Sequence, residues 1–199
     1  MPFFTVIISV SIYALNDASF SYLTRYISHL GSGPNGVGIV FNVGIMISSL
    51  TMIFFFLNMS AFLRRKKANT ILIDIAFVSG VISSTGSFFI GVFPYTFMQG
   101  LHNISATFFF MGGFAYCIFY GISEWITQDI SKLQASSGFI VGFFYLLFII
   151  FTAINYFNPT LASEQSHITE WMLISALMVW IIIHEAAMYR DKKHNLKES

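Results

Sequence analysis

Charged side chains are scarce in this 199-residue chain, and their scarcity decides the class of protein. Asp, Glu, Lys and Arg together make up 10% of the residues, whereas hydrophobic residues make up 56%. A soluble domain of this size has too little interior to bury so many apolar side chains. The composition therefore excludes a soluble globular protein and predicts an integral membrane protein.

Cysteine, excess positive charge and enzyme motifs are also missing or nearly so. Cys117 is the single cysteine, so no disulfide forms within the chain, and its apolar neighbours favour a buried thiol. The formal net charge is only +1, which excludes nucleic acid as a partner. The sequence has no Gly-x-Ser-x-Gly, HExxH, Walker or Rossmann pattern, so the chemistry of soluble enzymes has no support.

Six apolar segments are present, each close to the ~20 residues that a helix needs to cross a hydrocarbon core of ~30 Å. Backbone groups in lipid must be satisfied within their own segment, so uninterrupted helices are expected. The short connections predict antiparallel neighbours. We therefore expect an all-α fold in which residues 1–199 form a single domain, a compact bundle of six transmembrane helices. The expected spans lie near 3–24, 37–62, 70–92, 103–123, 136–156 and 168–189.

Small residues recur at helical spacing within these spans, which predicts faces of close helix contact. Gly44 and Ser48 mark such a face in the second span, and Gly80 marks one in the third. Gly138 and Gly142 form a Gly-x-x-x-Gly pattern in the fifth span. That last face fits packing within the bundle and packing against a second copy equally well, so a homo-oligomer stays open.

Basic residues predict the orientation of the bundle. Nine of the ten lie where one side of a six-span bundle would place them, and Arg25 lies on the other side. The positive-inside rule then predicts a multi-pass cell-membrane protein with both termini in the cytoplasm. Four of the nine are consecutive, at positions 64–67. They are either a plain stop-transfer run or residues that contact anionic lipid. The nine are Arg64, Arg65, Lys66, Lys67, Lys132, Arg190, Lys192, Lys193 and Lys197.

Polar and ionisable residues at the opposite, outer face are the main indication of function. Asp17 lies about fifteen residues into the first span, at the outer edge of the bilayer, where an ionisable group is a functional candidate by default. Histidines follow in the first outer loop and at the start of the fourth and sixth spans. The candidate ligand-binding residues are Asp17, Ser28, His29, His102, Asn103, His167 and Glu170.

Two kinds of site fit these side chains. Imidazoles and a carboxylate from separate outer ends could hold zinc or another transition metal with an open water position, which would support hydrolysis. The same groups could instead orient a lipid headgroup at the mouth of the bundle without any metal. A structural interpretation also exists for Glu170, because Ser166 and Glu170 together are typical of a helix N-terminus. The candidate metal ligands are His29, His102, His167 and Glu170.

The inner end of the sixth span carries a second pair of ionisable residues, His184 and Glu185. We expect them to pair with Asp74 or with the lysines of the tail. The middle of the bundle offers mainly Asn, Ser and Thr, so a proton relay across the whole membrane is not expected.

Three short motifs resemble those of one membrane family. They are Tyr26-Ile27-Ser28-His29-Leu30-Gly31, Phe41-Asn42-x-Gly44, and Gly91-Val92-Phe93-Pro94 followed by His102. They are similar to the six-helix family catalogued as domain of unknown function 998, over most of the chain. The Glu170-Trp171 opening of the last span is similar to the related DRAM/FRAG-like group. The position of His29 is usually acidic in the family. The resemblance implies a role with membrane lipid, because related eukaryotic groups are linked to lipid remodelling and distribution.

Three functions remain open at this point, and whether the protein is an enzyme is one of the open questions. The first is an integral membrane protein whose outer polar pocket binds or organises a lipid headgroup, with membrane lipid as the partner. The second is a metal-assisted intramembrane hydrolase acting on a lipid. The third is a small-solute transporter or channel, which would need a continuous polar path through the bundle.

Overall fold

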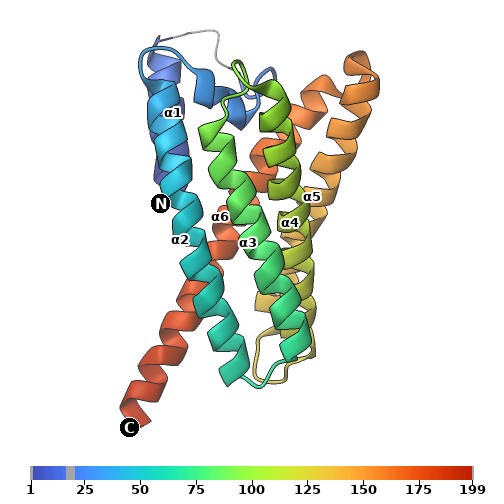
Figure 1. Cartoon of the computed structure of the whole chain (residues 1–199). Coiled ribbons are helices and arrows are strands. Elements are labelled where there is room, and N and C mark those ends of the chain that lie inside the picture. Colours follow the sequence, from blue (N-terminus) through green and yellow to red (C-terminus); the bar gives the residue numbers. More distant parts are fainter. Residues whose placement is uncertain (1, 17–20, 199) are drawn as a thin grey trace.

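The computed structural model describes residues 2–16 and 21–198, and all regular structure in this part of the chain is helical (Figure 1). The predicted all-α class is therefore confirmed. In chain order the elements are α1 (Pro2–Asn16), the 3-10 helix η1 (Ile27–Ser32), α2 (Val37–Arg65), α3 (Thr70–Val92), α4 (Gln99–Ile126), α5 (Lys132–Phe157) and α6 (Pro159–Glu198).

Among the described residues, five helices are long and apolar enough to cross a membrane. They are α2 to α6, and each contains one of the predicted spans. The α3 helix has the predicted bounds, whereas α4 and α6 extend beyond the apolar runs that predicted them. The chain is thus a multi-pass helical membrane protein. The predicted count of six spans is not confirmed.

The first predicted span, 3–24, differs most from the structure. Its helix, α1, ends at Asn16 and contains 15 residues, so it is about 22 Å long, short of the ~30 Å hydrocarbon core. Residues 21–24 form a turn, and η1 follows. The sequence overestimated this span because the apolar and aromatic residues after residue 20 fold back over the bundle instead of extending the helix.

The long helices run alternately up and down, and each packs against the next in the chain (Figure 1). The last helix, α6, returns toward α2, but these two approach each other at only a few positions. The α1 helix lies along α2, and η1 sits at the end of the bundle that carries the α1–α2, α3–α4 and α5–α6 connections. This arrangement leaves room between α2 and α6.

Glycines allow α3 and α4 to touch backbone to backbone. A Cβ added at Gly86 would lie 2.5 Å from the Phe109 backbone nitrogen and 2.6 Å from the Ser105 carbonyl oxygen. One added at Gly112 would lie 2.8 Å from the Ser79 carbonyl oxygen. Gly86 and Gly112 therefore mark a contact face that the sequence analysis did not name. The contact predicted on the third span, at Gly80, is made with α2, where an added Cβ would lie 2.7 Å from the Phe56 ring.

The Gly-x-x-x-Gly face of α5 packs within the bundle. A Cβ at Gly138 would lie 2.9 Å from the Cys117 carbonyl oxygen, and one at Gly142 would lie 2.8 Å from the Ile118 side chain, both on α4. Of the two interpretations left open by the sequence, the structure supports the internal one. Homo-oligomerisation stays a prediction.

Aromatic rings fill the core below the middle of the bundle. The Tyr116 ring centroid lies 4.7 Å from that of Phe56 on α2 and 5.6 Å from that of Trp180 on α6. Tyr145 of α5 joins the cluster, its hydroxyl 3.4 Å from that of Tyr116. All four side chains are almost completely buried. At this depth the interior of the bundle is therefore filled by packed aromatic side chains.

Basic residues gather at the end of the bundle opposite η1, and several are engaged in ion pairs. Arg64 pairs with Asp74 across the α2–α3 turn. The Lys66 ammonium lies 2.7 Å and the Arg65 guanidinium 3.3 Å from the carboxylate of Asp191 on α6. Three of the four residues predicted to contact anionic lipid thus bind carboxylates of the protein itself. Lys67, the fourth, is exposed at the end of the turn.

The close contact of α3 with α4 predicts a strong effect of Gly86→Ala. The new methyl group meets backbone atoms, which cannot rotate away, so the helices must separate, and we expect a loss of about 1–3 kcal/mol in the free energy of unfolding. Gly100→Ala on α4 is the matched control, because nothing lies within 4 Å of its added Cβ. Detergent-denaturation titrations of both variants measure the difference. Equal stability of the two would contradict the close contact.

Candidate functional site

The outer end of the bundle is covered by residues 21–32, here called the cap segment. The first turns of α6 hold it in place through side chains that the sequence had marked as candidates. The Ile27 N–H donates to Glu170 Oε2 at 2.6 Å. The imidazole Nδ1 of His167 lies 3.0 Å from the Leu23 carbonyl oxygen, to which it donates. Both candidates therefore position the cap segment.

Tyr26 anchors the cap segment from the other side. Its hydroxyl lies 2.7 Å from the Ser166 hydroxyl and accepts a hydrogen bond from the Asn155 amide at 3.1 Å. The Trp171 indole N–H donates to the Arg25 carbonyl oxygen at 2.9 Å. Burial raises the pKa of the Tyr26 phenol, so it stays neutral. These bonds tie the segment to both α5 and α6.

His102 stands in the first turn of α4 and is 4% exposed. Its Nδ1 lies 2.8 Å from the Phe93 carbonyl oxygen in the turn that precedes α4. Because a carbonyl can only accept, Nδ1 carries the proton, and Nε2 of the neutral ring is a hydrogen-bond acceptor. The ring also meets the edge of Tyr95, at a centroid separation of 5.5 Å. His102 is thus held rigidly in one tautomer.

His29 lies among aromatic rings in the cap segment. Its ring centroid is 5.2 Å from that of Tyr95, 5.3 Å from that of Tyr26 and 6.4 Å from that of His167. Burial is the main cause that lowers its pKa to about 4, with smaller contributions in the same direction from electrostatic interaction with His167, Arg25 and His102. His29 is consequently neutral at physiological pH.

The predicted metal site is not formed. Over residues 2–16 and 21–198, no three His, Cys, Asp or Glu side chains are grouped as ligands of one ion would be. Zinc needs its ligand atoms ~2.0–2.2 Å away. Instead, His102 and His167 each direct Nδ1 at a backbone carbonyl, and Glu170 accepts from a backbone amide. The structure therefore does not bring His29, His102, His167 and Glu170 together around one point, and metal binding by this set stays a prediction.

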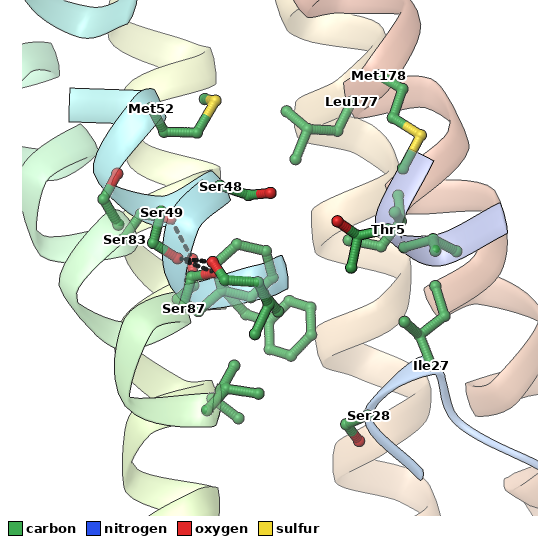
Figure 2. Close-up of a pocket in the computed structure, with 18 of the residues that line it drawn as sticks. Thr5, Ile27, Ser28, Ser48, Ser49, Met52, Ser83, Ser87, Leu177 and Met178 are labelled. Carbon is green, nitrogen blue, oxygen red and sulfur yellow. Dashed lines mark hydrogen bonds between the residues drawn. The ribbon is translucent and has the colours of Figure 1, made fainter. Parts of the chain in front are cut away.

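A cavity of about 110 Å³, counted as space open to the centre of a water molecule, lies below the cap segment. Helices α2, α3, α4 and α6 form its walls, with α1 and η1 closing one side (Figure 2). Ser28, His102 and Glu170 line its outer end, and Phe56 and Tyr116 of the aromatic core line its inner end. It is therefore polar at the outer face and apolar along most of its length.

The candidates predicted from sequence that lie within the described residues divide into three groups. Ser28, His102 and Glu170 come together at the cavity although they lie on η1, α4 and α6. His29 and His167 lie in or against the cap segment and are not among the residues that line the cavity. Asn103 is exposed on the side of α4 that faces away from it. Asp17 lies outside the described residues.

Serines form a polar stripe on one wall of the cavity, and sequence reasoning assigned such residues to helix packing alone. Figure 2 shows four of them, Ser48, Ser49, Ser83 and Ser87, across the open space from Thr5, Ile27 and Ser28. Their signal in the sequence was weak, because a small polar residue in a span favours helix contact as often as ligand contact. The stripe consists of Ser48, Ser49, Ser83, Ser84 and Ser87.

A family model agrees with the resemblance seen in the motifs. The model described as "Protein of unknown function (DUF998)" matches residues 2–187. The chain belongs to this family. No curated protein and no solved structure matches it. The match includes the cap segment, the serine stripe and His102, so all parts of the cavity lie inside the family domain. A relation to the DRAM/FRAG-like group stays a prediction.

A buried ionisable pair near the inner end of the family domain was missed. His184 Nε2 lies 3.0 Å and 3.1 Å from the two carboxylate oxygens of Glu124, and both residues are 0% exposed. The Gln134 amide donates to the same carboxylate at 2.6 Å. Among the described side chains, the partner of His184 is therefore Glu124, where the sequence had predicted Asp74 or the tail lysines. Glu124 was overlooked because the predicted span, 103–123, ended one residue before it.

This pair holds a proton between its two members. His184 Nδ1 lies 2.8 Å from the Trp180 carbonyl oxygen and must donate to it. An unprotonated Nε2 facing an unprotonated carboxylate would place two acceptors against each other, so one proton lies between them. The pair joins α4 to α6, and Gln134 adds α5. It serves as a polar connection of three helices within an apolar bundle.

The environment of His29 predicts a pH dependence of stability. The unfolded chain binds the His29 proton with a pKa of 6.5 and the folded protein with a pKa of about 4. Between these values the unfolded state binds more protons, so the free energy of unfolding falls as the pH drops through this window. His29→Gln removes this contribution. The melting temperature of wild type should then fall more than that of His29→Gln between about pH 7 and about pH 5. Equal falls would show that His29 is solvated.

The buried pair predicts different effects for two substitutions of Glu124. Glu124→Ala leaves Nε2 of His184 without a partner and should cost about 3–5 kcal/mol. Glu124→Gln should cost much less, since its amide N–H replaces the shared proton and its carbonyl still accepts from Gln134. Glu185→Ala, next to His184 but exposed, is the control. Detergent-denaturation titrations compare the three variants, and equal losses for Ala and Gln would contradict the shared proton.

Proposed function

We propose that this protein binds a single amphipathic lipid in the cavity under the cap segment, with the lipid's headgroup at the outer end. The observation that carries the proposal is the polarity of the cavity. His102, Glu170 and Ser28 lie at its outer end, and the walls below are mostly apolar. An amphiphile has the same division of polar and apolar parts. This interpretation needs neither a metal nor a nucleophile.

The dimensions of the cavity support a chain-shaped ligand. Along α2 its lining runs from Phe41 to Phe56, and along α4 from His102 to Tyr116. At 1.5 Å per residue these stretches measure about 22 Å and about 21 Å, more than half of the hydrocarbon core. A space that is long and has a volume of only about 110 Å³ is narrow. It fits one alkyl or prenyl chain better than a compact solute.

The charges around the cavity favour an uncharged, hydroxyl-bearing headgroup. His102 offers the acceptor Nε2, and Glu170 offers a buried carboxyl group. Among the described residues that line the cavity there is no Lys or Arg to pair with a phosphate. Hydroxyl groups, as in a glycerol or sugar headgroup, can donate to both acceptors. We therefore propose a neutral glycerolipid-like or glycolipid-like ligand.

The closed inner end supports binding over transport. The aromatic core formed by Phe56, Tyr116 and Trp180 stands between the cavity and the inner end of the bundle. A transporter or channel would need polar groups to continue through this level. The inner ionisable pair of Glu124 and His184 lies beyond it and is fully buried.

The orientation proposed for the protein follows from its charges. The basic residues of the α2–α3 turn, Lys132 and the α6 residues after Tyr189 all lie at the end opposite the cap segment. This end should face the cytoplasm of the cell membrane, which places the cap segment and the headgroup on the outer side. A cytoplasmic N-terminus stays a prediction, because α1 is too short to cross.

Filling the cavity tests the proposal. Ala106 on α4 lines the cavity and Thr107 beside it is exposed, so Ala106→Leu and Thr107→Leu place similar bulk inside and outside. Native mass spectrometry of protein purified in mild detergent should show one bound lipid on wild type and on Thr107→Leu. Retention by Ala106→Leu should fall at least about ten-fold, which corresponds to ~1.4 kcal/mol. Equal retention by both variants, or no bound lipid on wild type, would refute the proposal.

A further inference from the structure

Two serine hydroxyls in the wall of the cavity have no hydrogen-bond partner among the described residues. Ser48 on α2 is 3% exposed and Ser84 on α3 is 4% exposed, and both line the cavity. Figure 2 shows the Ser48 hydroxyl directed into the space between α2 and α6. A buried hydroxyl without a partner is unfavourable, and such groups in folded proteins are nearly always satisfied. The cavity is where a partner for them would lie.

Other hydroxyls on the same helices behave differently. In an apolar environment a helical Ser or Thr ordinarily donates to the carbonyl four residues earlier. Thr51 on α2 does so to Ile47 at 2.9 Å, and Thr85 on α3 does so to Val81 at 2.8 Å. Ser48 makes no such bond although it is only one turn away on α2. On α2 and α3, Ser48 and Ser84 are thus the buried hydroxyls without a partner in the described part of the chain, and both line the cavity; Ser9, Ser123 and Thr152 on other helices also lack one but do not line it.

The remaining serines of the stripe are already satisfied. The Ser49 hydroxyl lies 2.9 Å from that of Ser87 and 2.7 Å from the Ile45 carbonyl oxygen. Ser83 donates to the Phe109 carbonyl oxygen at 2.8 Å. Within the stripe, the hydroxyl groups still available to bind a ligand are therefore those of Ser48 and Ser84.

Their depth separates them from the headgroup end. Ser48 lies seven residues below Phe41, and Ser84 lies six residues below Ile90, the outermost lining residues of α2 and α3. These separations correspond to about 10 Å and about 9 Å along the helices. Two donors at the same depth on adjacent helices would meet one point of a chain that runs along the cavity.

We infer that the ligand bears an oxygen-containing group, a hydroxyl or a carbonyl, part-way along its chain, and that Ser48 and Ser84 bind it. The inference rests on the proposed function and names its ligand more closely: an oxygenated chain below a neutral headgroup. A plain saturated or unsaturated chain would leave both hydroxyls facing methylene groups. An oxygen at this depth would accept from one serine or both.

Glycerol monoricinoleate and glycerol monooleate are the probes that test it, because they differ by one hydroxyl in the middle of the chain. Their affinities are measured by titration calorimetry on the full-length protein after delipidation in mild detergent. Wild type should bind the ricinoleate ester about ten-fold more tightly, the effect of one buried hydrogen bond. Ser48→Ala/Ser84→Ala should bind both esters with the affinity that wild type has for the oleate ester.

The matched control is Thr51→Val/Thr85→Val, which removes two hydroxyls from the same helices on exposed faces. It should keep the ten-fold preference. Because the two serine hydroxyls have no partner, their removal should leave the melting temperature of the lipid-free Ser48→Ala/Ser84→Ala variant unchanged or higher. A lower melting temperature would indicate misfolding, which is thereby distinguished from a loss of ligand contact.

The outcomes separate the two proposals. Equal binding of both esters by wild type would overturn the mid-chain inference and leave lipid binding intact, and it would assign the two hydroxyls to buried water, for which the cavity has room. A preference that persists in the serine variant would overturn the inference as well. Binding of neither ester would count against the neutral-lipid proposal itself.

Discussion

The hydrogen bond from the Ile27 N–H to the Glu170 carboxylate is the interaction on which the outer half of this molecule depends. It engages a buried acidic residue about three turns into α6 and fastens the cap segment across the mouth of the bundle. Without a cap, the space between α2 and α6 would be an open cleft. With it, the same space is a cavity whose outer end presents His102, Glu170 and Ser28. The carboxyl group of Glu170 therefore both holds the cap segment and lines the cavity.

Close packing elsewhere explains why the cavity lies where it does. Glycines such as Gly86 and Gly112 bring α3 against α4, and Gly138 brings α5 against α4. No comparable series of close contacts joins α2 to α6. Each of the helices α2 to α6 packs tightly against its neighbour in the chain, whereas the first and the last, α2 and α6, are in loose contact. Space is therefore left between α2 and α6. The short α1 and η1 cover that space on one side but do not fill it.

The two ends of the bundle use ionisable residues in different ways. At the inner end, Glu124 and His184 bind each other, and Gln134 and the Trp180 carbonyl complete their hydrogen bonds. Both ionisable residues are sealed from solvent, as expected of a structural connection. At the outer end, His102 and Glu170 satisfy backbone groups with one atom each and still border a cavity. A polar group that is held rigidly and yet faces open space is suited to orienting a ligand. This difference is the reason for assigning binding to the outer end.

The sequence by itself determined the membrane class, the helical fold and the positions of the five long apolar helices, because an apolar run of about twenty residues in lipid has few alternatives to a helix. It also predicted that Gly44 and Gly138 are contact positions, and its three short motifs indicated the family that the family model shows. These properties depend on local composition and spacing, which one chain displays directly.

Only the tertiary structure decided which polar residues meet. It shortened α1, turned residues 21–32 into a cap, directed His167 and Glu170 at backbone groups of that cap, and paired His184 with Glu124. It also left the hydroxyl of Ser48 facing a cavity. The physical reason is that periodicity specifies the face of a helix on which a residue lies but not which helix lies opposite, since that depends on how all the helices pack together.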